Sequence, residues 1–286
     1  MDLCNEKDIR ALLGRHGFRF SKSMGQNFLI EGWVPRDIAE ASSAGPDTGV
    51  LEIGPGIGPL TVQLARRAAK VAAIELDRTL YPILAETLAP YPNAEVVPGD
   101  AMKLDLAALV SDKFSGLTVI ACANLPYNIT TPVLTALIEA GCFASITVMI
   151  QREVALRICA APGSSDYGAF SVFCQYHTQP ELLFEVGPEC FLPAPKVTSA
   201  VIRLVPRSAP PQNLVDESFF FQVVRASFAQ RRKTLLNGLS SAFGSRLSKD
   251  ALRGAIESAG LPADIRGERL GIPEFATLAS ALQNRL

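Results

Sequence analysis

The segment between residues 49 and 76 constrains the fold more than any other part of the chain. An apolar run, GVLEIG at 49–54, ends in glycine, and a helical pattern and a second apolar run at 71–76 follow it. The same alternation continues through further apolar runs at 95–97 and 117–123. Continuous apolar strands that alternate with helices are typical of a parallel sheet covered on both faces. The sequence therefore predicts an α/β fold.

The pattern changes after about residue 180. Two apolar stretches at 181–186 and 200–205 are predicted to be strands at the edge of the sheet, and RSAPPQN at 207–213 has the composition of a linker. Beyond the linker, apolar residues recur at helical spacing. We therefore predict an amino-terminal segment, a Rossmann-like domain and a small all-helical carboxy-terminal domain, which cover residues 1–29, 30–208 and 209–286.

Composition excludes several classes of protein. Of the 286 residues, 48% are hydrophobic and 19% are charged, which is ordinary for a folded globular protein. No apolar run approaches the roughly 18 residues that cross a bilayer, so we expect no membrane association. The six cysteines are scattered singly along the chain, and the chain has only two histidines. The residues therefore lack the spacing of a metal site, and we expect none. Cysteines in apolar stretches suit a reducing compartment, and we expect a cytoplasmic protein.

The charges are distributed unevenly, although the formal net charge is −1. Residues 183–286 contain more Lys and Arg than Asp and Glu, whereas the preceding part of the chain contains more Asp and Glu. A basic face on the carboxy-terminal part would attract phosphate groups. The alternative is a solvated helical surface, and motifs must decide between the two.

A glycine-rich loop joins the first predicted strand to the helix after it. Its sequence, EIGPGIG at 52–58, makes a tight turn of bare backbone against which a ligand can lie near a helix N-terminus. A dinucleotide-binding fingerprint requires a glycine at the position of Pro59. The E-x-G-x-G-x-G pattern instead resembles the cofactor loop of methyltransferases that use S-adenosylmethionine. Gly54 and Gly56 are its candidate cofactor-binding residues.

Carboxylates at the ends of the next two predicted strands fit the same ligand. Glu75 ends the second strand, where a carboxylate can accept both hydroxyls of a ribose. Asp77 lies nearby, but the alternation along the strand favours Glu75. Asp100 follows the third strand and can accept the exocyclic amine of adenine. Exposed acids often follow strands, so the prediction depends on the loop and both acids together.

The tetrapeptide Asn124-Leu125-Pro126-Tyr127 follows the fourth predicted strand, at the edge where open α/β sheets bind ligands. It suits methylation of an exocyclic amine, whose lone pair is delocalised into an aromatic ring. The Asn124 side-chain oxygen and the Leu125 carbonyl can accept the amine hydrogens and localise that lone pair. Pro126 favours an extended Leu125, and Tyr127 can stack on the target base. These four residues are the candidate catalytic residues; a plain turn with a buried tyrosine is the alternative.

Together these motifs resemble those of the bacterial 16S rRNA adenine N6,N6-dimethyltransferases, the KsgA/RsmA family. The resemblance covers nearly the whole chain. It is carried by KSMGQNFL at 22–29, LEIGPGIGPLT at 51–61, IELD at 74–77, GDA at 99–101, NLPYNIT at 124–130, FLPAPKV at 191–197 with Ser199, and RRKTLLN at 231–237. Met24 and Thr130 stand where the family often has leucine and serine.

The resemblance implies an enzyme that transfers methyl groups from S-adenosylmethionine to N6 of two adjacent adenosines in the 3′-terminal hairpin of 16S rRNA, during maturation of the small ribosomal subunit. It implies a segment at 21–29 that closes over the site, and a cofactor site lined by Asn27, Leu29, Gly54, Glu75, Asp100 and Asn124. It implies RNA contacts from Lys22, Phe191, Lys196, Arg231, Arg232 and Lys233, of which the last three start a predicted helix.

Two alternatives remain open. One is an enzyme that methylates adenine N6 in 23S rRNA; such relatives favour isoleucine at the position of Leu125. The other is a non-catalytic ribosome assembly factor on the same scaffold. The intact glycine loop and Asn124 favour an enzyme over the second alternative.

Overall fold

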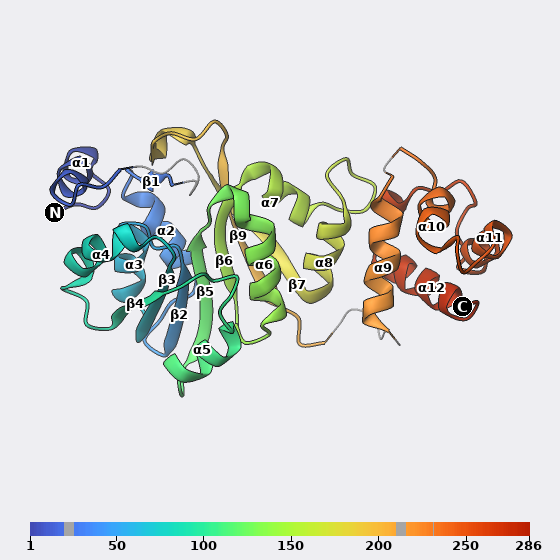
Figure 1. Cartoon of the computed structure of the whole chain (residues 1–286), viewed down its shortest axis with the longest axis horizontal. Coiled ribbons are helices and arrows are strands. Elements are labelled where there is room, and N and C mark those ends of the chain that lie inside the picture. The colour runs from blue at the N-terminus through green and yellow to red at the C-terminus, as the bar shows by residue number, and fades with distance from the viewer. Residues whose placement is uncertain (20–25, 210–215, 231) are drawn as a thin grey trace. The chain divides into compact units, whose positions relative to one another are not determined.

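Figure 1 shows a computed structural model of the chain, which describes residues 1–19, 26–209, 216–230 and 232–286. The chain forms two compact units. The first consists of Met1–Ala155 and Pro180–Pro206, and the second of Leu156–Gln179 and Arg207–Leu286. The sequence pattern places residues 156–179 in the Rossmann-like domain, whereas in the structure Val172 and Tyr176 of this segment pack with the carboxy-terminal helices.

A seven-stranded sheet forms the centre of the first unit (Figure 1). Five neighbouring strands are parallel, as the alternation of apolar runs and helices predicts, and β9 pairs antiparallel with β6. The two late strands predicted at the sheet edge are β9 and β7. From one edge to the other, the order is β4 (Ala94–Pro98), β3 (Lys70–Glu75), β2 (Thr48–Ile53), β5 (Thr118–Asn124), β6 (Ile146–Gln151), β9 (Ser199–Pro206) and β7 (Thr178–Val186).

Helices bury the apolar faces of this sheet. Val34 and Ile38 of α2 and Leu60 and Leu64 of α3 pack in one cluster with strand residues such as Val50. The strand residues are apolar on both faces because helices follow successive strands. The helices of this part of the chain are α1 (Glu6–Arg15), α2 (Trp33–Ala41), α3 (Pro59–Ala65), α4 (Tyr81–Leu88) after the 3₁₀ turn η2 (Arg78–Leu80), α5 (Leu106–Lys113), α6 (Thr130–Glu139) after η3 (Tyr127–Ile129), and α7 (Arg152–Cys159).

The order of the strands creates a switch point between β2 and β5. From β2 the chain adds β3 and then β4 on one side, and it returns to place β5 and β6 on the other side. Loops that leave neighbouring strands in opposite directions open a crevice at the carboxyl ends of those strands, where α/β proteins bind ligands. The glycine loop follows β2, and Asn124 ends β5. The fold therefore brings both motifs to one crevice.

A second, two-stranded sheet borders the same end of the first unit. Strands β1 (Phe28–Leu29) and β8 (Phe191–Leu192) pair antiparallel, and β8 follows the 3₁₀ turn η4 (Pro188–Cys190). The backbone N–H of Ile30 also donates to the Cys190 carbonyl at 2.9 Å. This pairing ties the amino-terminal segment to the connection between β7 and β9.

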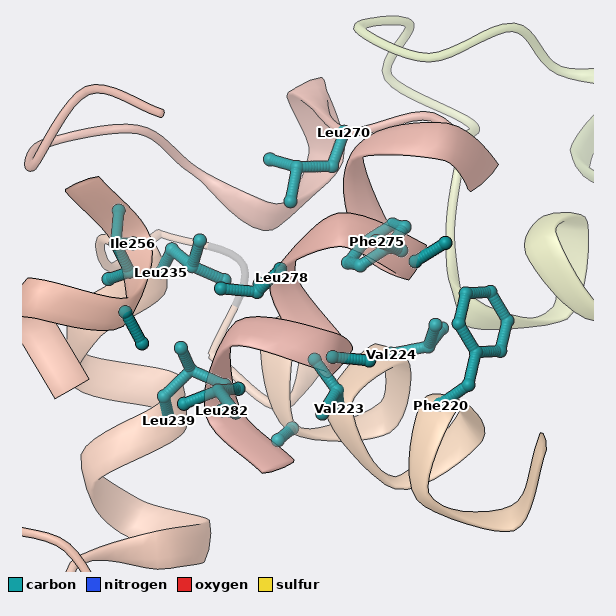
Figure 2. Packing of buried hydrophobic residues seen from close by; sticks show 14 of the residues in the cluster. Phe220, Val223, Val224, Leu235, Leu239, Ile256, Leu270, Phe275, Leu278 and Leu282 are labelled. Atoms are coloured by element: carbon teal, nitrogen blue, oxygen red, sulfur yellow. The ribbon is translucent and has the colours of Figure 1, made fainter. Parts of the chain in front are cut away.

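The second unit is helical and has its own core. Figure 2 shows buried side chains of this core, among them Phe220 and Val223 of α9, Leu235 and Leu239 of α10, and residues of α11 and α12. No helix in the described ranges is long and apolar enough to span a membrane. The part of the chain beyond the linker is helical, as the spacing of its apolar residues predicts. The helical elements of this unit are α8 (Ala169–His177), α9 (Glu217–Phe228), α10 (Leu235–Phe243), α11 (Lys249–Ser258), η5 (Gly267–Arg269) and α12 (Ile272–Gln283).

Helices α9 and α10 approach each other closely at Gly238. A Cβ atom built at Gly238 lies 2.5 Å from the carbonyl oxygen of Ala226, whereas one built at Gly254 of α11 meets only Arg285, at 3.9 Å. Alanine is favoured over glycine inside a helix by roughly 0.5–1 kcal/mol. In chemical denaturation of the full chain we therefore expect Gly254→Ala to stabilise by about that amount and Gly238→Ala to destabilise by roughly 1–3 kcal/mol. Equal effects of the two substitutions would contradict this packing.

Candidate functional site

A cleft opens in the first unit at the carboxyl ends of the strands. Its empty space, with the open solvent at its mouth, is about 1220 Å³. Its lining comes from the loops after four parallel strands and from the β1–β8 pair. Of the residues that the sequence predicts at the cofactor or target base, those that line the cleft are Asn27, Leu29, Gly54, Gly56, Glu75, Asp100, Asn124, Leu125, Pro126, Tyr127 and Phe191.

The glycine loop presents bare backbone to this cleft. Gly54 and Gly56 have φ angles of 68° and 60°, in the left-handed region that side chains other than glycine rarely adopt. A Cβ atom at Gly54 would meet nothing within 4 Å, whereas one at Gly56 would lie 3.3 Å from the Phe28 ring. Gly54 is held in place by its N–H, which donates to the Ile74 carbonyl at 2.9 Å. The loop therefore needs glycine for its conformation and leaves open space beside Gly54.

Glu75 lies on the cleft, and the competing Asp77 does not line it. Burial raises the pKa of Glu75 above its usual range, while the backbone N–H groups of Asp77 and Gly56, which donate to its carboxylate, oppose this rise. The backbone nitrogen of Asp77 lies 2.7 Å from the Oε1 of Glu75, to which it donates a hydrogen bond. Asp77 itself accepts hydrogen bonds from Thr79 and from the Gln26 side chain. Of these two carboxylates, the one that the strand alternation favours lines the cleft, and its contact with a ribose stays a prediction.

Glu52, the first residue of the glycine-loop pattern, also lines the cleft. Its side chain is 1% exposed, and its Cα partners on the neighbouring strands are Ala73 and Cys122. Burial raises the pKa of Glu52 to about 8, and the charge of Glu75 adds to this rise. Its Oε2 has no hydrogen-bond partner among the described residues. Within that part of the chain, no group of three or more His, Cys, Asp or Glu is placed to hold a metal ion.

The turn after β5 leaves two acceptors without donors. The N–H of Leu125 donates to the Met149 carbonyl at 3.1 Å, which fixes the turn to β6. The carbonyl of Pro126 accepts from the N–H of Ile129 and the hydroxyl of Thr130. No hydrogen bond within the described ranges reaches the Leu125 carbonyl or the Asn124 side chain. These are the two acceptors that the sequence predicts for the target amine.

Two aromatic side chains border the cleft beside this turn. Tyr127 is half-buried, and its hydroxyl lies 2.7 Å from the Oγ of Ser199. Burial raises the pKa of the Tyr127 phenol. Phe191 is 3% exposed in β8, where its backbone pairs with Leu29. Tyr127 therefore offers aromatic surface to the cleft, whereas Phe191 lines it with little exposed surface.

The predicted RNA-contacting cations that the structure describes do not line the cleft. Lys196, Arg232 and Lys233 are exposed. The expectation that Arg232 and Lys233 start a helix is wrong, because α10 begins at Leu235 with Thr234 as its N-cap, and the two cations lie in the turn before it. Lys22 and Arg231 lie outside the described residues.

Comparison of the sequence with protein families finds a match over residues 17–259 to the model of ribosomal RNA adenine dimethylase. A ribosomal RNA small subunit methyltransferase A from Geobacillus sp. (strain WCH70) is 45% identical to this chain, and the match covers 100% of this chain and 99% of the relative. The protein of the same name from Geobacillus kaustophilus is 46% identical, over 98% of this chain and 97% of the relative.

Solved structures agree with this result. A dimethyladenosine transferase from Plasmodium falciparum superimposes with a TM-score of 0.73 at 25% identity, over 90% of this chain and 98% of that one. The 23S rRNA methyltransferase ErmE superimposes with a TM-score of 0.67 at 26% identity, over 90% of this chain and all of that one. The α/β fold with a helical second part is therefore that of the Rossmann-like methyltransferases.

The buried carboxyl of Glu52 generates a prediction about stability. Because its pKa is about 8 in the folded protein and near 4.5 when exposed, the folded state binds the proton more tightly. The unfolding free energy should therefore fall as pH rises through this interval, by at most about 1.4 kcal/mol per pH unit. The glutamine of Glu52→Gln cannot ionise. In urea denaturation at pH 5, 7 and 9, the unfolding free energy of this variant should therefore change less with pH than that of the wild type, and at pH 9 it should be the larger of the two.

The exposed Glu40→Gln is the matched control, since it removes a carboxyl outside the cleft. It should keep the wild-type profile. A Glu52→Gln variant that loses stability between pH 5 and 9 as steeply as the wild type would contradict the buried, protonated carboxyl.

Proposed function

The chain belongs to the ribosomal RNA adenine dimethylase family, and we propose that it transfers methyl groups from S-adenosylmethionine to N6 of two adjacent adenosines in the 3′-terminal hairpin of 16S rRNA. The products are N6,N6-dimethyladenosines, formed while the small ribosomal subunit matures. The observation that carries this proposal is one cleft that holds the bare glycine loop, the Glu75 carboxylate and the acceptors of Asn124 and Leu125, which receive no hydrogen bond from the described residues.

The residues of the cleft fit S-adenosylmethionine. The open space beside Gly54 allows a ligand to lie against backbone, Glu75 can accept the ribose hydroxyls, and Asp100 can accept the adenine amine. Asn27 and Leu29 border the same space from β1 and the residue before it. When bound, the cofactor supplies a methyl group on a positively charged sulfur.

Asn124 and Leu125 prepare the target nitrogen. The N6 lone pair of adenine is delocalised into the ring and is a poor nucleophile. In the first transfer the Asn124 side-chain oxygen and the Leu125 carbonyl accept the two amine hydrogens, which favours a more tetrahedral nitrogen with a localised lone pair. In the second transfer the monomethylated amine has one hydrogen left, which one of the two acceptors receives. Pro126 favours an extended conformation of Leu125, which helps to direct the Leu125 carbonyl outward. Orientation of this kind lowers the barrier because the reacting groups are already placed.

Tyr127 and Phe191 hold the base once it has left the RNA stack. Stacking of a base on an aromatic side chain contributes roughly 1–3 kcal/mol. Unstacking an adenosine costs a few kcal/mol and costs least in a loop. A hairpin target suits this balance. Phosphate contacts from Lys22, Lys196, Arg231, Arg232 and Lys233 then position the RNA without reading its sequence.

Methylation of 23S rRNA is the second candidate function. The 23S rRNA methyltransferase ErmE shares the fold at 26% identity, whereas the small-subunit relatives share 45–46% over nearly their whole length. This difference favours the 16S target. The unpaired acceptors on an open cleft favour an enzyme over a non-catalytic assembly factor.

We also propose that the protein works in the cytoplasm. All six cysteines are free, and Cys122, Cys174 and Cys190 are buried. Free, buried thiols are typical of a reducing compartment. The ribosomal target proposed above is consistent with this location.

The proposed function is tested by transfer of tritiated methyl groups from S-adenosylmethionine to small ribosomal subunits that lack this modification. Purified full-length protein should label 16S rRNA, and mapping should place dimethyladenosine at two adjacent positions of the 3′-terminal hairpin. Label confined to 23S rRNA in an assay with large subunits would assign the second candidate function.

Asn124→Ala separates binding from reaction in the same assay. The variant should bind the cofactor but lose about 10²- to 10³-fold in the rate of transfer, the range seen when an oriented hydrogen-bonding group is removed from an active site. Calorimetry measures the cofactor affinity. The exposed Asn284→Ala is the control and should keep wild-type transfer. Wild-type turnover by Asn124→Ala would contradict its assigned role.

A further inference from the structure

The hydroxyl of Tyr127 forms a hydrogen bond with Ser199, a residue that has no role in the proposed reaction. Tyr127 lines the cleft, and its hydroxyl is 2.7 Å from Ser199, which lies 72 positions further along the chain. Ser199 has no exposed surface and is not part of the cleft lining. The ring of Tyr127 therefore borders the cleft while its polar end is held by a residue behind the lining.

Both partners of this hydrogen bond are fixed to strand β6. The N–H of Leu125 donates to the carbonyl of Met149, which fixes the turn that carries Tyr127. Ser199 is the first residue of β9 and pairs with Gln151, the last residue of β6. Backbone pairing within one sheet thus fixes the positions of the two segments that carry these hydroxyls.

From this geometry we propose that Ser199 is a positioning residue that fixes the ring of Tyr127 for the target adenine. The inference rests on the proposed function. Stacking itself needs only an aromatic face, which a phenylalanine also provides. A tyrosine whose hydroxyl is anchored cannot turn about its Cα–Cβ bond without breaking the bond to Ser199, so the ring keeps one orientation before the base arrives.

Ser199 also connects the segments that carry the two aromatic residues of the cleft, Tyr127 and Phe191. The segment that leads to it begins at Phe191, whose backbone pairs with Leu29 in the β1–β8 sheet. The hydrogen bond therefore joins the end of this segment to the turn that carries Tyr127. In this arrangement, Ser199 helps to set the position of Tyr127 relative to Phe191.

A double-mutant cycle distinguishes positioning from a merely structural hydrogen bond. We expect Ser199→Ala and Tyr127→Phe each to lower kcat/KM for small subunits by about three- to tenfold, the range of one ordinary hydrogen bond. The double variant should lose no more than either single variant, because both remove the same interaction. Cofactor affinity should stay at the wild-type value in Ser199→Ala, since Ser199 does not line the cleft.

Ser145→Ala is the matched control. Ser145 is also buried, immediately before β6, and its hydroxyl has no hydrogen-bond partner among the described residues. Loss of this hydroxyl should leave transfer unchanged. Wild-type kcat/KM in Ser199→Ala, or losses that add in the double variant, would overturn the proposal.

Fluorine NMR of protein labelled with 3-fluorotyrosine provides a readout that does not depend on activity. The chain has five tyrosines, and loss of a signal in Tyr127→Phe assigns that of Tyr127. This signal should shift or broaden in Ser199→Ala and stay in place in Ser145→Ala. An unchanged signal in Ser199→Ala would overturn the proposal even if transfer is normal in the wild type. Absence of transfer by the wild type would instead contradict the proposed function, and the role of Ser199 with it.

Discussion

The parallel pairing of β2 with β5 is the interaction on which the rest of the site depends. It places Glu52 beside Cys122 in register, so that the glycine loop and the turn beginning at Asn124 leave neighbouring strands at one edge. The chain adds β3 and β4 on one side of β2 and β5 and β6 on the other, and this strand order by itself opens a crevice between β2 and β5. A cofactor and a target base can meet there because the backbone hydrogen bonds of the sheet fix both motifs.

Local sequence patterns predict much of this arrangement. The apolar runs predicted the parallel strands, the positive φ angles of Gly54 and Gly56 follow from a loop that only glycine forms without strain, and strand alternation chose Glu75 over Asp77. The long-range contacts were not predictable in this way. The bond from Tyr127 to Ser199 and the packing of residues 156–179 with the later helices depend on which strands and helices become neighbours.

Several polar groups at the cleft have no partner among the described residues. These are the Asn124 side chain, the Leu125 carbonyl and the Oε2 of Glu52. Folded proteins usually pair buried polar groups, since an unpaired one costs about 1–3 kcal/mol. Buried side chains elsewhere, such as Ser145 and Thr147, also lack partners among the described residues, but the three groups named here line the cleft, where a ligand can supply the missing hydrogen bonds. The Glu52 carboxyl was missed because its burial comes from neighbouring strands and helices and not from its own segment.

A crystal structure of the full chain with S-adenosylmethionine and adenosine tests the central claim most directly. The account predicts that the reactive methyl carbon lies beside the adenosine N6, with the two amine hydrogens directed at the Asn124 side-chain oxygen and the Leu125 carbonyl. The base should stack on the ring of Tyr127. A methyl carbon far from residues 124–127, or an N6 amine whose hydrogens point at other groups, would contradict the account.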